Sequence, residues 1–128
     1  MAVNKLNSRA HRLLLEYRTT LWRISALEVV PGVGCKALQA YKERILFVQS
    51  LVEILRNHKR LGDRLYSVIY AAYMTQWQPI DVDETLHIIE KTCGRISRRT
   101  YYRLRERAIE ILDSHMEEIM KDECASYV

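Results

Sequence analysis

Apolar residues recur at spacings of three and four along most of this chain, and only two prolines, Pro31 and Pro79, interrupt the pattern. The spacing matches the roughly 3.6 residues per turn of an α-helix, whereas a half-buried strand would alternate every second residue. Because proline breaks a helix interior, these two residues divide the chain into three helical stretches. The sequence therefore predicts an all-α fold, and its 128 residues suit one compact core.

The first two helices are expected at about residues 3–29 and 36–58. Because the connector 31–34 is short, they are expected to form an amphipathic antiparallel hairpin over residues 1–60. The second stripe repeats as a coiled coil does, and its apolar width also suits a second chain. The expected buried positions are Ala10, Leu13, Tyr17, Leu21, Ile24, Leu27, Leu38, Tyr41, Ile45, Val48, Val52 and Leu55, with Phe47, Leu51 and Ile54 beside them.

Three further helices are expected in a domain over residues 61–120, followed by a flexible tail at 121–128. Asp81 or Asp83 suits the N-cap of the fourth helix, and Gly94 suits the left-handed backbone that ends it. Ser97 is a favoured N-cap for the fifth helix. The expected inward positions are Leu65, Val68, Ile69, Ala72, Tyr73, Leu86, Ile88, Ile89, Tyr101, Leu104, Ala108, Ile111 and Leu112.

The short turn between Gly94 and Ser97 predicts a helix-turn-helix arrangement, whose second helix enters the DNA major groove. From Arg95 to Arg107 the chain carries six arginines and one acidic residue, Glu106. Arginine donates two hydrogen bonds to guanine, whereas contacts to phosphates supply affinity without sequence information. We expect base contacts from Arg98, Arg99, Tyr102 and Arg103, and phosphate contacts from Arg95, Arg105 and Arg107, with Ser97 and Thr100 as lesser phosphate candidates.

A solvated helix face is the alternative interpretation of this charge run. In that case Glu106 pairs with Arg103, and Glu110 pairs with Arg107 or Arg103, at helical spacing. An ordinary surface mixes both signs of charge, whereas residues 95–107 hold six arginines and one acidic residue. The one-sided pattern favours a nucleic-acid surface.

The runs Leu65–Tyr73, Ser97–Leu104 and Ala108–Leu112, with Ile88 and Ile89 between them, resemble the ArpU/RinA group of phage and prophage transcriptional regulators. The C-terminal half of that group is similar to the DNA-binding fourth region of bacterial sigma factors. The resemblance covers about residues 61–113 and implies a three-helix helix-turn-helix domain that recognises an operator or promoter-proximal sequence. It further implies control of late phage genes, usually by activation, in the cytoplasm of a Gram-positive host.

The leading hypothesis is therefore a sequence-specific DNA-binding transcriptional regulator whose partner is double-stranded DNA. Its N-terminal helices would form a homodimer or contact RNA polymerase. One alternative is a helical adaptor whose functional surface is the stripe over residues 38–55 and whose arginines bind an acidic protein. Another is a DNA-binding protein like the small subunit of a DNA-packaging machine, which would assemble into a ring.

Catalysis, cofactors, metal binding and membrane insertion are not expected. The chain has no phosphate-binding glycine loop and no nucleophile constellation. Its cysteines lack a Cys-x-x-Cys pair, its histidines are equally scattered, and no apolar run approaches the ~20 residues of a membrane span. A cytoplasmic protein is expected. The residues concerned are Cys35, Cys93, Cys124, His11, His58, His87 and His115.

Overall fold

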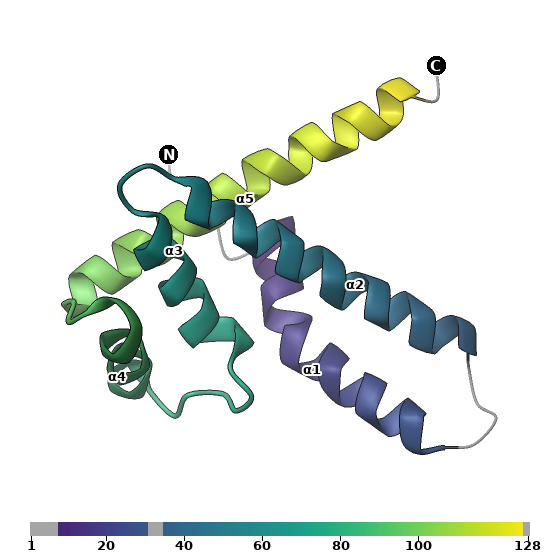
Figure 1. Ribbon diagram of the computed structural model, residues 1–128, viewed down its shortest axis with the longest axis horizontal. Coiled ribbons are helices and arrows are strands. Elements are labelled where there is room, and N and C mark those ends of the chain that lie inside the picture. Colours follow the sequence, from purple (N-terminus) through teal and green to yellow (C-terminus); the bar gives the residue numbers. More distant parts are fainter. Residues whose placement is uncertain (1–7, 31–34, 127–128) are drawn as a thin grey trace.

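Figure 1 shows the computed structural model, which describes residues 8–30 and 35–126. Within these ranges every regular element is helical, so the predicted all-α class is confirmed. The connector 31–34 and the expected helix start at residue 3 lie outside the described residues. The elements are α1 (Arg9–Val29), α2 (Cys35–Glu53), the 3-10 turn η2 (Ile54–Asn57), α3 (Gly62–Ile69), the π-helical turn η3 (Tyr70–Met74), α4 (Val82–Cys93) and α5 (Arg98–Ser126).

The first two helices, α1 and α2, lie side by side and antiparallel, as the short connector predicts (Figure 1). Ser8 starts α1 because its hydroxyl oxygen accepts a hydrogen bond of 3.1 Å from the backbone N–H of His11. Tyr17 is buried on the inner face, and its hydroxyl accepts from Gln49 of α2 at 3.0 Å. The hairpin is therefore held by apolar burial with a polar contact at its edge.

The inner face of α2 buries the predicted stripe. Ile45, Val48 and Val52 are all buried in the core of the chain. Leu38 and Tyr41, the first two positions of the stripe, remain partly exposed. Phe47 also differs from expectation, because its side chain is 38% exposed.

The hairpin and the C-terminal helices share one hydrophobic core. His11 of α1 is buried, and its Nε2 lies 3.1 Å from the hydroxyl of Tyr73 in η3. The backbone N–H of Ala10 donates to Asp113 of α5 at 3.0 Å. Arg18, whose pKa is lowered by burial, donates to carbonyl oxygens in and just after η3. These contacts fix the orientation of the hairpin relative to α5.

The helix ends differ from the predicted ones where tertiary packing intervenes. The second helix tightens into η2, and the third widens into η3, so neither keeps a uniform α period to its end. The fifth helix continues to Ser126, past the expected end at residue 120, and Figure 1 shows its C-terminal part projecting beyond the other helices. Residues 121–126 are thus helical rather than frayed.

Candidate nucleic-acid interface

The turn between α4 and α5 is built by two local signals. Gly94 has a φ of 93°, and its N–H donates to the carbonyl of Glu90 at 3.3 Å, which ends α4. Ser97 opens α5, because its hydroxyl oxygen accepts from the N–H of Thr100 at 3.1 Å. The same two residues also join their hydroxyl groups at 3.0 Å. Four residues, 94–97, therefore separate the two helices.

One face of α5 is buried and holds the first turns of the helix against the core. Tyr101, Leu104 and Ala108 are buried, as expected. Burial raises the pKa of the Tyr101 hydroxyl, and the nearby Arg105 guanidinium acts in the opposite direction. Because these side chains fix the rotation of α5 about its own axis, the opposite side of the helix is held toward solvent.

Three predicted contact residues on or beside α5 are exposed and unengaged within the described part of the chain. Arg95, Arg99 and Arg103 have no ion pair, hydrogen bond or ring contact there. Arg99 and Arg103 are four residues apart, so they lie on one face of α5 a single turn from each other. Tyr102, 41% exposed, lies beside them. Together these side chains form the arginine face, defined here as Arg99, Tyr102 and Arg103.

Arg98 is engaged by the same molecule. Its Nη2 and Nε donate to Oδ1 of Asp83 in α4, at 2.7 and 3.2 Å. These hydrogen bonds and the charge of Asp83 raise the pKa of Arg98. The pair lies at the surface, with 60% of the arginine side chain exposed. Arg98, which the sequence predicts as a base reader, is therefore paired with a carboxylate of the same molecule.

Two further arginines are partly occupied. Arg105 places its guanidinium carbon 5.2 Å from the ring centre of Tyr102, so this cation covers the edge of the arginine face. Arg107 forms an ion pair with Glu110 at 3.8 Å, which is one of the pairs that the solvated-face alternative predicts. Glu106 also has an interaction of its own. The unneutralised charge is therefore concentrated in the first two turns of α5.

The α4 side of the turn is acidic. Asp81 caps α4 by accepting from the N–H of Glu84 at 2.9 Å, and Asp83 lies in the same first turn. A surface hollow between α4 and the turn is lined by Asp83 and Glu90 as well as by Arg95. The sequence analysis predicts Asp81 and Asp83 only as candidates for the helix cap. It does not predict that their negative charge lies close to the arginines of α5, although only α4 and the turn separate the two groups in the sequence. The turn therefore has negative charge on its α4 side and positive charge on its α5 side.

Within residues 8–30 and 35–126, no group of three or more His, Cys, Asp or Glu side chains is arranged to hold a metal ion. No helix of the described residues has the length and apolarity that crossing a bilayer requires. A comparison with protein families, curated proteins and solved structures finds no match to this chain.

Proposed function

We propose that this chain is a sequence-specific DNA-binding transcriptional regulator that reads the major groove with the first turns of α5. The observation that carries the proposal is the arginine face, whose two guanidinium groups have no partner among the described residues. Arginine at this position of a helix-turn-helix can bond guanine O6 and N7 in a bidentate manner. The buried anchors of α5 keep these groups in place before DNA arrives.

The proposed roles follow from how each side chain is held. Arg99 and Arg103 read base edges, and Tyr102 contacts a thymine methyl or a phosphate. Arg95 lies in the turn, where phosphates would pass. A second group has weaker claims as phosphate or base contacts, because its side chains are already engaged within the chain; its members are Ser97, Arg98, Thr100, Arg105 and Arg107.

The finer assignment, a phage or prophage late-gene activator, rests on the sequence resemblance over about residues 61–113. Activation requires a second contact, either with RNA polymerase or with another copy of the regulator. The DNA-binding proposal does not depend on that choice, because the arginine face works in a monomer or in a larger assembly. A packaging-type ring would be distinguished by its size in solution.

Equilibrium binding to duplex DNA at several salt concentrations tests the proposal. Each neutralised phosphate is expected to contribute about −0.9 to the slope of log affinity against log salt. Arg99→Ala or Arg103→Ala should each weaken binding to a preferred site by about 5- to 150-fold, which corresponds to ~1–3 kcal/mol per bidentate contact. Arg23→Ala on α1 removes an exposed arginine elsewhere and should change little. Absent or salt-insensitive binding would refute the proposal.

Self-association is supported by the outer face of α1. Leu15, Trp22 and Val29 follow one another at intervals of seven residues and are 56%, 63% and 80% exposed. A heptad interval keeps side chains on one side of a helix, as in a seam between two chains. We propose a second copy of the chain as the occupant, since a dimer would read two half-sites about one DNA turn apart.

Sedimentation over a range of protein concentrations tests this dimer. Trp22→Asp should shift the chain toward the monomer, whereas Lys36→Asp, an exposed change on α2, should not. Four positions of the stripe expected over residues 38–55 are buried in the core, so α1 offers the larger exposed apolar face; they are Ile45, Val48, Val52 and Leu55. A wild-type chain that stays monomeric at every concentration contradicts the dimer and leaves DNA reading by α5 intact.

A further inference from the structure

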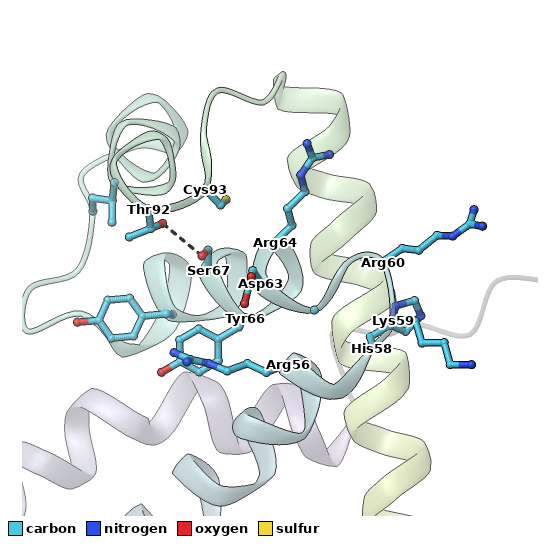
Figure 2. Close-up of a pocket in the computed structure, with 13 residues that line it drawn as sticks. Arg56, His58, Lys59, Arg60, Asp63, Arg64, Tyr66, Ser67, Thr92 and Cys93 are labelled. Atoms are coloured by element: carbon cyan, nitrogen blue, oxygen red, sulfur yellow. Dashed lines mark hydrogen bonds between the residues drawn. The ribbon is translucent and has the colours of Figure 1, made fainter.

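A second group of cations surrounds the chain reversal between η2 and α3. Figure 2 shows a surface hollow lined by Arg56, Lys59, Arg60 and Arg64, with Asp63 as the acidic residue of the lining. The predicted second helix ends at about residue 58 and the predicted C-terminal domain begins at residue 61, so the sequence analysis assigns no function to the chain between them. The hollow lies outside the arginine face.

Backbone hydrogen bonds make the reversal a defined structure. The N–H of His58 donates to the carbonyl of Leu55 at 3.2 Å, and the N–H of Gly62 donates to the carbonyl of His58 at 3.1 Å. A Cβ atom at Gly62 would lie 2.8 Å from the carbonyl carbon of Arg56, so only glycine lets the chain close this tightly. The cations on the reversal are thus presented on a fixed backbone.

Three of the four cations have no counter-charge within the described part of the chain. Arg56 is occupied, because it pairs with Glu53 at 3.4 Å and covers the ring of Tyr66 at 3.8 Å. Lys59, Arg60 and Arg64 are exposed and have no ion pair there. Cations that line one concave surface without counter-charges attract an anion.

The hollow adjoins the turn that leads into α5. The hydroxyl of Thr92, near the end of α4, donates to Ser67 of α3 at 3.2 Å. Arg64 precedes Ser67 by three residues, so it lies one turn farther along the same edge of α3. Arg64 is therefore close to the segment that connects the end of α4 to Arg95. Figure 2 shows Arg64 pointing toward this connecting segment.

We infer that the hollow binds phosphates of the same DNA duplex whose bases α5 reads, with Arg60 and Arg64 as the main donors. The inference rests on the proposed function and extends it. An exposed, unpaired guanidinium forms charge-assisted hydrogen bonds with a phosphate and supplies no sequence information. Arg64 lines the hollow together with Cys93, the last residue of α4, and Cys93 precedes Arg95 by two residues.

The test compares the double variant Arg60→Gln/Arg64→Gln with a charge-matched control, Arg23→Gln/Lys36→Gln, at the far end of the hairpin. Loss of two phosphate contacts should make the salt slope shallower by about 1.8 and weaken binding at 0.1 M salt by about 60-fold. The preferred sequence should stay the same. The control should keep the wild-type slope, and both variants should melt as the wild type does.

A third variant, Arg60→Lys/Arg64→Lys, keeps the charge and should retain most of the slope. The inference is overturned if the glutamine variant has the slope of the control, or if the lysine variant loses as much as the glutamine variant. A changed sequence preference would also overturn it, since the hollow would then read bases. Wild-type protein that does not bind duplex DNA would refute the proposed function itself. Wild-type protein that binds, together with a glutamine variant of equal salt slope, would refute only this inference.

Discussion

Replacing Asp83 with asparagine is expected to strengthen DNA binding. In the free protein, one oxygen of Asp83 receives two hydrogen bonds from Arg98, at 2.7 and 3.2 Å. A neutral amide oxygen accepts hydrogen bonds about half as strong as those of a carboxylate. The substitution therefore releases Arg98 toward DNA and removes a negative charge from the α4 side of the turn.

The size of the effect follows from counterion release. One additional phosphate contact steepens the slope of log affinity against log salt by about 0.9, which is roughly eightfold in affinity at 0.1 M salt. The fold should lose little, because Asp83 contributes only about 0.3–1 kcal/mol through its position at the N-terminus of α4. Fluorescence anisotropy with labelled duplex measures the binding, and urea unfolding measures the stability.

Glu84→Gln is the matched control. Glu84 lies in the same first turn and is also acidic, but its carboxylate accepts from the N–H of Ile80 at 2.8 Å rather than from an arginine. Glu84→Gln should change the DNA affinity by no more than about twofold, because solvent and salt largely screen an exposed charge that contacts no cation. Equal gains in the two variants would show that Arg98 is not held back by Asp83. A loss of affinity in Asp83→Asn would contradict the reasoning altogether.

Other predictions concern the fold. Gly62→Ala should lower the unfolding free energy in urea by about 1–3 kcal/mol, since the new methyl group meets the backbone of Arg56; an unchanged midpoint would refute this. Tyr73→Phe should cost about 0.5–1.5 kcal/mol through the lost contact with His11, as measured by thermal unfolding. Burial raises the pKa of Tyr73 and Tyr101 above the ordinary value of 10.0, so the fold favours their neutral forms. Stability should be complete below about pH 10 and decline as pH rises past it, whereas a flat alkaline profile would contradict the assignment.

The end of α4 and the start of α5 could be predicted from local signals in the sequence. Gly94 and Ser97 end and begin helices through their own backbone and hydroxyl groups, so their roles could be predicted without knowledge of the fold. Asp81 and Asp83 were equivalent candidates for the cap of α4. The structure selects Asp81, which leaves Asp83 free to reach Arg98.

Features that depend on packing between distant segments were not predictable. Leu14, Ile109 and Met116 are buried because several helices meet around them, and a single-helix stripe does not show this. His11 is buried through its contact with Tyr73, 62 residues away. The cations around the reversal are far less conspicuous in the sequence than the run near Ser97. The fold gathers them in one hollow.

Selection of bound duplexes from a random library, with wild-type protein and with Arg99→Ala and Arg103→Ala, is the most direct test of the arginine face. The wild type is expected to enrich a defined motif that contains guanine, and each substitution should relax the preference at its own position in the motif. An identical motif from all three proteins, or no motif from the wild type, would contradict base reading by α5.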